Sequence, residues 1–124
     1  MSAMRKIVIH SALAEMRALI RGMLSDIEAL FVPIASREEL FRACRAVKYD
    51  LVLTDDVEML LHDRAAVTKI RGVESLPQIF VLSHNLSEEG AVALLAAGVN
   101  QIIALPVAPE RLYGKVSAPY SDLV

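Results

Sequence analysis

The chain has 124 residues, of which 55% are hydrophobic and only 5% aromatic, and its formal net charge is −2 at pH 7. This length predicts a single domain over residues 1–124 with an aliphatic core, and the charge argues against nucleic-acid binding by this domain. No apolar run reaches the ~18 residues of a membrane span, and the single Cys44 suits a reducing cytoplasm, so we expect a cytoplasmic protein.

Short apolar runs recur along the chain and predict five strands. Most of the runs are continuous rather than alternating, which is typical of parallel strands covered on both faces. The runs are KIVIH at 6–10, LFVPI at 30–34, DLVLT at 50–54, PQIFVLS at 77–83 and QIIAL at 101–105.

Helical patterns separate these runs. The predicted helices span 13–27, 36–47, 64–71 and 87–97, followed by a last one from Pro109 that Pro119 is expected to end. Ser36 and Glu39 can form a capping box, Asp63 can cap the third helix, and Gly98 suits the end of the fourth. Strand–helix alternation of this kind predicts an α/β fold, with a doubly wound five-stranded parallel sheet between two helix layers.

Several polar residues fall where such folds hold their chemistry, beyond the carboxyl ends of the strands. The clearest is Asp55, which directly follows the apolar run DLVLT. The other residues expected at this edge are Ser11, Ser83, His84 and Leu105.

Three motifs in order resemble the response-regulator receiver domain, the family of the chemotaxis protein CheY. YDLVLTD is similar to the strand that ends in the phosphoacceptor aspartate, here Asp55, and FVLS to the strand that ends in a switch residue, here Ser83. AAGVNQIIALPVAPERL resembles the last strand and helix, with Ile102 at the aromatic switch position and Pro106 at the family's proline. The resemblance covers nearly the whole chain and implies a flavodoxin/CheY-like three-layer (βα)5 fold.

The chain departs from this family at positions that carry its chemistry. The acidic pair that helps to hold Mg²⁺ appears here as Ser11 and Ala12, and the family's lysine appears as Leu105. The turn after Asp55 reads EMLLHDR and lacks the proline and glycine of the family's MPxMDG. Phosphoryl transfer depends on neutralising charge at the phosphoryl oxygens, so Asp55 alone is a poor site for it.

These departures predict a pseudo-receiver, that is, a non-enzymatic signalling module without a metal or other cofactor and with weak or absent Mg²⁺ binding. As the resemblance implies, its partner would be a histidine kinase, an output domain or another signalling protein. The alternative is a working phosphoacceptor that a histidine kinase phosphorylates on Asp55, either alone or as the N-terminal domain of a longer regulator. A nucleotide-binding α/β domain is disfavoured, because HSALAE after the first strand contains no glycine.

The remaining candidates concern surfaces and histidines. The helix at 87–97 has more apolar residues than one stripe needs, so Leu94 and Leu95 are candidates for an interface or a homodimer through this helix, the strand at 101–105 and the last helix. Small alanines that are harmless on a surface explain the excess equally well. Asp56 is expected to point into solvent, and His84 could form a pH-sensitive contact with Asp55. The three histidines have no metal-ligand spacing.

Overall fold

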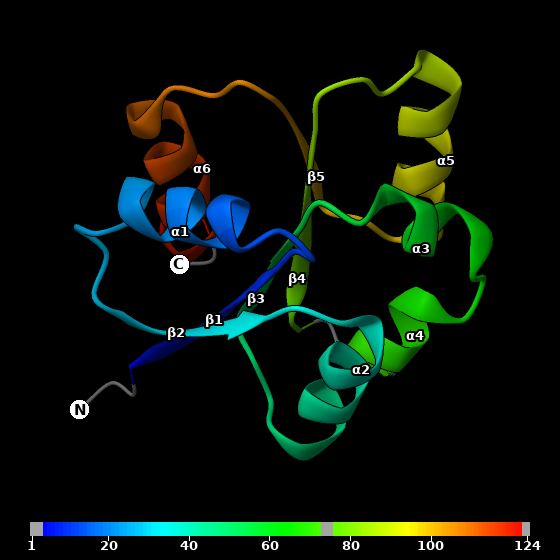
Figure 1. The fold of residues 1–124 in the computed structure, drawn as a ribbon, viewed down its shortest axis with the longest axis horizontal. Coiled ribbons are helices and arrows are strands. Elements are labelled where there is room, and N and C mark those ends of the chain that lie inside the picture. Colours follow the sequence, from blue (N-terminus) through cyan, green and yellow to red (C-terminus); the bar gives the residue numbers. More distant parts are fainter. Residues whose placement is uncertain (1–3, 73–75, 123–124) are drawn as a thin grey trace.

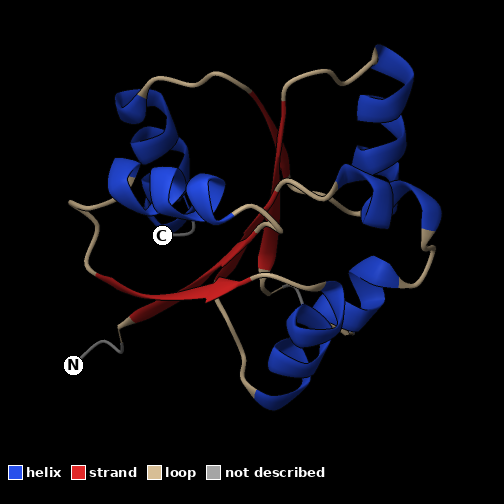
Figure 2. Cartoon of the chain, viewed as in Figure 1, coloured by secondary structure: helices blue, strands red, loops and turns tan. Residues whose placement is uncertain are grey.

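The structure is a computed structural model that describes residues 4–72 and 76–122. Within these residues, strands and helices alternate along the chain (Figures 1 and 2). The strands are β1 (Arg5–His10), β2 (Ala29–Ile34), β3 (Leu51–Thr54), β4 (Gln78–Ser83) and β5 (Gln101–Ala104). The helices are α1 (Ala14–Met23), α2 (Arg37–Ala46), α3 (Val57–His62), α4 (Ala66–Arg71), α5 (Glu88–Ala97) and α6 (Pro109–Asp122).

All five strands are parallel and form one sheet in the order β2-β1-β3-β4-β5. This is the strand order of flavodoxin-like doubly wound folds. Figure 1 shows α1 and α6 on one side of the sheet and α2 to α5 on the other. The predicted fold class is therefore confirmed.

The sheet separates two aliphatic cores, because successive side chains of a strand point to opposite faces. On the α2–α5 face the buried strand residues are Val8, Ile34, Val52, Ile79 and Val81. On the α1–α6 face they are Ile7, Ile9, Leu51, Leu53, Phe80, Leu82 and Ile103. Strands buried on both faces explain the continuous apolar runs in the sequence.

Two helix predictions need correction. The segment between β3 and β4 contains two helices, α3 and α4, rather than one, and Asp63 is the C-cap of α3. A helix of six residues is too short to show a 3.6-residue period, so α3 left no clear signal. Helix α6 continues past Pro119 to Asp122, although proline cannot donate the backbone hydrogen bond expected at that position.

Edge strand β2 pairs only with β1, with Pro33 opposite Ile9. At its end the Ser11 N–H donates to the Ile34 carbonyl at 3.1 Å.

Among the described residues, no helix has the length and apolarity that crossing a bilayer requires.

Candidate functional site

The carboxyl ends of β1 and β3 carry two polar pairs side by side. His10 and Thr54 are register partners, and both are buried. The His10 Nδ1 atom lies 2.7 Å from Thr54 Oγ1. By strand alternation these two residues face the α2–α5 layer, and the next residues, Ser11 and Asp55, face the α1–α6 layer.

Ser11 holds the carboxylate of Asp55. The Ser11 hydroxyl donates to Asp55 Oδ2 at 2.7 Å and accepts the Leu13 N–H at 3.0 Å. The Asp55 N–H in turn donates to the His10 carbonyl at 3.3 Å. Ser11 is fully buried, whereas Asp55 is half-buried. A neutral hydroxyl thus satisfies the Asp55 oxygen from the position at which the resembled family has a carboxylate.

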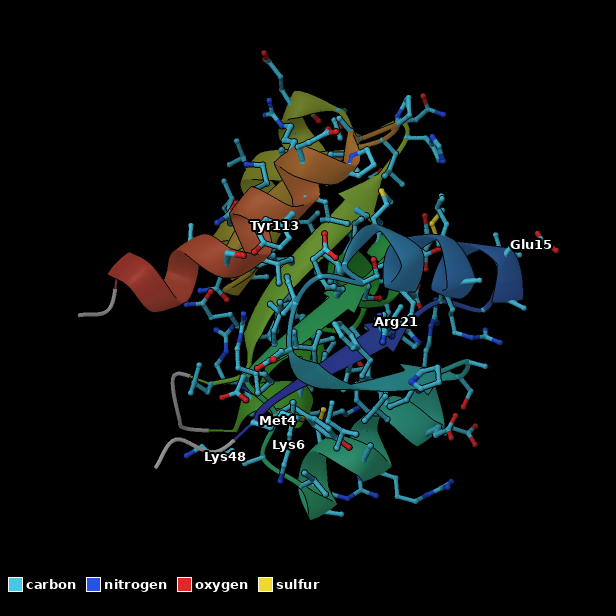
Figure 3. All side chains as sticks on the ribbon, turned by 90° about the vertical axis from the view of Figure 1, so that its left-hand side faces the viewer. Met4, Lys6, Glu15, Arg21, Lys48 and Tyr113 are labelled. Atoms are coloured by element: carbon cyan, nitrogen blue, oxygen red, sulfur yellow. The ribbon has the colours of Figure 1, made fainter. Side chains whose placement is uncertain are left out.

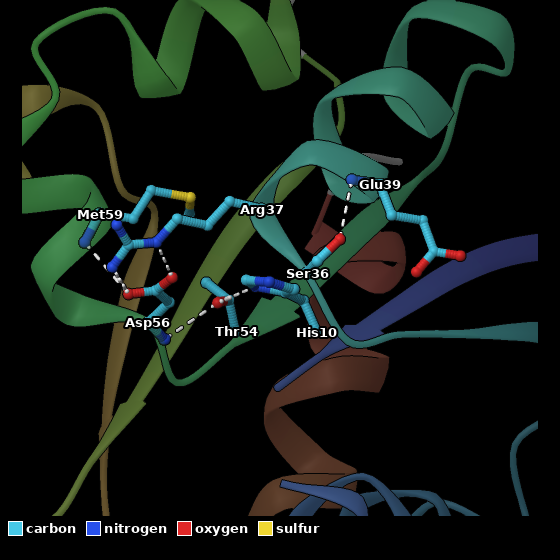
Figure 4. A network of polar contacts seen from close by, with 7 residues as sticks. All are labelled: His10, Ser36, Arg37, Glu39, Thr54, Asp56 and Met59. Carbon is cyan, nitrogen blue, oxygen red and sulfur yellow. Dashed lines mark hydrogen bonds and ion pairs between the residues drawn. The ribbon is translucent and has the colours of Figure 1, made fainter. Parts of the chain in front are cut away.

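Asp56 forms the second half of the site, contrary to the expectation that it points into solvent. Its carboxylate receives two hydrogen bonds from Arg37, at 2.6 and 2.9 Å, and one from the Met59 N–H at 3.1 Å (Figure 4). The side chain of Asp56 is only 19% exposed. Its role as N-cap of α3 turns it inward, and Arg37 reaches it from the first turn of α2.

The pKa of Asp56 reflects this pairing. Burial pushes the pKa up, but the hydrogen bonds from Arg37 and Met59 and the charge of Arg37 outweigh burial, so the pKa lies below its ordinary value. Asp56 is therefore a carboxylate at neutral pH, and it is fixed in position by two other elements.

A hydrogen-bond chain joins Asp56 to the buried histidine. The Asp56 N–H donates to Thr54 Oγ1 at 3.0 Å, and the same oxygen lies 2.7 Å from His10 Nδ1, so Thr54 links the Asp56 backbone to the imidazole. Burial lowers the pKa of His10, although the charges of Asp56 and Asp55 oppose the shift.

These side chains surround an open pocket of about 310 Å³. Its lining residues are His10, Ala12, Leu13, Ala35, Arg37, Asp55 and Asp56. The cation in this lining is Arg37, which is bound to Asp56, and the Ala12 side chain has no oxygen that could bind a metal ion. Across the residues that the structure describes, no three His, Cys, Asp or Glu side chains are grouped to hold a metal ion.

Other predicted site residues lie outside this lining. Ser83 ends β4 half-buried, and its carbonyl accepts the Leu105 N–H at 2.9 Å. Ile102 packs against the α2–α5 core, and Leu105 packs against the α1–α6 core. His84 is exposed, and the described lining of the pocket does not include it. A switch role for Ser83 and Ile102 stays a prediction.

The two candidate interface leucines have different environments. Leu94 is fully buried in the α2–α5 core, so its assignment to a surface is wrong. Leu95 is 53% exposed, and Val92 on the same helix is 66% exposed. Helix periodicity could not separate adjacent leucines here, because apolar residues occupy nearly every position of α5.

Neither a protein-family model nor a curated protein matches the sequence. Solved structures do match over nearly the whole chain. A response regulator from Thermotoga maritima has a TM-score of 0.83 at 18% identity, covering 96% of this chain and 99% of that one. A two-component response regulator from Clostridium difficile has a TM-score of 0.80 at 22% identity, covering 96% and 98%.

A CheY-like response regulator receiver domain protein from Methanospirillum hungatei is similar to the same extent. Its TM-score is 0.78 at 19% identity, covering 97% of this chain and 96% of that one. The strand order, the position of Asp55 and these structural matches agree. The chain therefore has the fold of the CheY-like response-regulator receiver domains.

Proposed function

We propose that this domain is a pseudo-receiver, a non-enzymatic signalling module that binds other proteins and does not use Mg²⁺-dependent phosphorylation. The observation that carries the proposal is the 2.7 Å hydrogen bond from Ser11 to Asp55. It satisfies the carboxylate with a neutral group at the position where the resembled receivers use an acidic metal ligand.

The charges around Asp55 support this proposal. Transfer of a phosphoryl group to a carboxylate needs positive charge close to the phosphoryl oxygens. Leu105 replaces the family's lysine and packs into the core. Arg37 lines the pocket, but the two hydrogen bonds that its guanidinium makes with described residues both go to Asp56. A hard cation would also find fewer carboxylate ligands than in the resembled family, since Ser11 and Ala12 occupy the positions of its acidic pair.

A partner surface is available on the other side of the sheet. Val92 and Leu95 expose apolar area on α5, on the side of the sheet that α2 to α5 cover. By analogy with the resembled family, a histidine kinase, an output domain, another signalling protein or a second copy of the chain would bind at this face. The effect of such a partner depends on its differential affinity for two conformations of the domain.

The test is the intact mass of the protein after incubation with acetyl phosphate and Mg²⁺. We expect no phosphate adduct on the native chain or on Asp55→Ala. A triple variant, Ser11→Asp with Ala12→Asp and Leu105→Lys, serves as the positive control because it restores the missing charges. An adduct on the native chain that is absent from Asp55→Ala would overturn the proposal.

One observation favours the alternative function, a working phosphoacceptor. Asp55 is half-buried and lines an open pocket, so a small phosphodonor can reach its carboxylate. The same mass measurement decides between the two functions, and an adduct would direct attention to Arg37 as the source of positive charge.

A further inference from the structure

An apolar groove between α1 and β2 is not used by the site described above. Its volume is about 240 Å³, and it is lined by Ile9, Arg17, Ala18, Arg21, Phe31 and Pro33. We call it the α1–β2 groove. It exists because β2 is an edge strand and α1 covers only part of its inner face.

The charges of this groove are all positive. The Arg21 guanidinium lies 4.2 Å from the centroid of the Phe31 ring, and an Arg17 nitrogen donates to the Ser11 carbonyl at 2.6 Å. Neither arginine forms an ion pair with any described residue, and no acidic residue lines the groove. Figure 3 shows Arg21 close to the strands beneath α1, whereas Glu15 lies at the far end of that helix.

Helix α5 presents the complementary surface. Residues Glu88, Val92, Leu95 and Ala96 recur at helical spacing and are all exposed, Val92 by 66% and Leu95 by 53%. We call this stripe the α5 ridge. The helix from Glu88 to Ala97 has two glutamates in its first turn and contains no basic residue. Neither glutamate forms an ion pair with a described residue.

The two surfaces match in polarity and in charge. The ridge offers apolar side chains one helical turn from carboxylates, and the groove offers an apolar floor beside two arginines. Burying Val92 and Leu95 on that floor removes apolar area from water, and the glutamates then lie close to unpaired guanidinium groups. We propose that the α5 ridge of one copy docks into the α1–β2 groove of a second copy.

The arrangement of the fold makes this contact head-to-tail. In Figure 1, α1 lies on the opposite side of the sheet from α5, so one molecule cannot fill its own groove. A copy whose ridge is bound still has an empty groove, and a copy whose groove is bound still has a free ridge. Such a heterologous contact extends to chains or closes into rings, in contrast to a symmetric dimer through α5. It does not depend on whether Asp55 is phosphorylated.

Sedimentation velocity of the full chain over a concentration series tests this contact. We expect reversible association that passes beyond the dimer and weakens as salt is added. Arg21→Glu in the groove and Val92→Glu on the ridge should each weaken association by at least tenfold. Arg45→Glu makes the same charge change on exposed α2, and Leu19→Glu alters an α1 side chain that is 54% exposed, so both should associate like the native chain.

Mixing the two defective variants gives the decisive result. Arg21→Glu keeps an intact ridge and Val92→Glu keeps an intact groove, so an equimolar mixture should form a 1:1 complex and nothing larger. Circular dichroism of each variant checks that the fold is retained. A native chain that stays monomeric throughout, a mixture without a complex, or an Arg21→Glu variant that associates normally would each overturn the proposal. The last result would indicate a symmetric contact through α5.

Discussion

The hydroxyl of Ser11 and the carboxylate of Asp55 lie at the ends of neighbouring strands, 2.7 Å apart. Ser11 is fully buried and is held on its other side by the Leu13 N–H. A side chain at position 11 therefore lies next to the Asp55 carboxylate, whether that side chain is neutral or charged. The pair therefore allows the proposed loss of Mg²⁺ binding to be tested by restoring acidic side chains beside Asp55.

Replacing Ser11 and Ala12 together by aspartate should make stability depend on Mg²⁺. Three carboxylates close together repel one another when no cation is present, so we expect the variant to melt below the native chain. Mg²⁺ that binds only the folded state should recover the loss, by about 2.7 kcal/mol at a hundredfold excess over its dissociation constant. Thermal unfolding with Mg²⁺ or EDTA measures this. The Ser11→Asn, Ala12→Asn variant should show no Mg²⁺ effect, and a similar response in both variants would contradict the prediction.

Thr54→Val should destabilise the domain although valine nearly preserves the shape. Thr54 is fully buried, and its hydroxyl is bonded to both His10 and the Asp56 N–H. Both partners would lose a hydrogen bond in a buried place, at a cost of about 1–3 kcal/mol. Urea unfolding gives the change in free energy. Thr54→Ser keeps the hydroxyl and should lose less, and equal losses would assign the effect to packing.

His10 should make stability fall as the pH is lowered toward 5. Burial lowers its pKa below the ordinary value of 6.5, against the charges of Asp56 and Asp55 and together with those of Arg37 and Arg17. The folded state then binds fewer protons than the unfolded chain, so this contribution is complete above pH 6.5 and is lost as the pH falls through the lowered pKa. Asp56, whose pKa is also lowered, adds a second loss below its ordinary value of 3.8.

Urea unfolding at a series of pH values between about 7 and 5 checks the histidine contribution. His10→Asn cannot titrate in this range and should flatten the slope. An unchanged slope in this variant would mean that other groups carry the dependence.

Arg37→Gln should raise the pKa of Asp56. The guanidinium supplies two hydrogen bonds and a charge to that carboxylate, and without them burial is opposed mainly by the hydrogen bond from the Met59 N–H. Carboxyl NMR titration of the native and variant proteins measures the shift. Arg37→Lys keeps the charge but not the two-pronged contact, so its Asp56 pKa should lie between the other two. If Arg37→Gln leaves the pKa unchanged, the cap to Met59 alone fixes Asp56.

The variants Leu94→Ala and Leu95→Ala should lose different amounts of stability, because only the first removes a side chain from the core. Leu94 is fully buried, so its truncation should cost about 2–5 kcal/mol. Leu95 is 53% exposed, and its truncation should change stability by no more than about 0.5 kcal/mol. Urea unfolding compares the two variants, and comparable losses would mean that Leu95 also packs in the core.

The strands could be predicted from the sequence because parallel strands buried on both faces leave continuous aliphatic runs. Their order followed from the resemblance to the receiver family. The position of Asp55 could be predicted from the same apolar runs. Asp55 directly follows one of them, and doubly wound folds place the carboxyl ends of their parallel strands at one edge of the sheet. Leu94 was misplaced because α5 is apolar almost all round, so a periodicity rule had no polar face to use as a reference.

The Arg37–Asp56 half of the site could not be predicted in this way. Arg37 reaches Asp56 across a gap of 19 residues in sequence, from another helix. The sequence around an arginine in the first turn of a helix does not indicate which carboxylate the arginine binds. The capping role of Asp56 was a usable signal, because aspartate three residues before Met59 suits an N-cap, but it depended on recognising the short helix α3.

Pro33 limits how the sheet itself can grow. The Ile34 carbonyl points toward β1, where it accepts the Ser11 N–H, and backbone groups alternate in direction along a strand. Pro33 therefore directs its backbone to the open edge of β2, where it offers no N–H to an incoming strand. Strand addition and backbone-templated fibrils are disfavoured at this edge. At high concentration, copies of the protein can then associate through side-chain contacts and still dissociate on dilution.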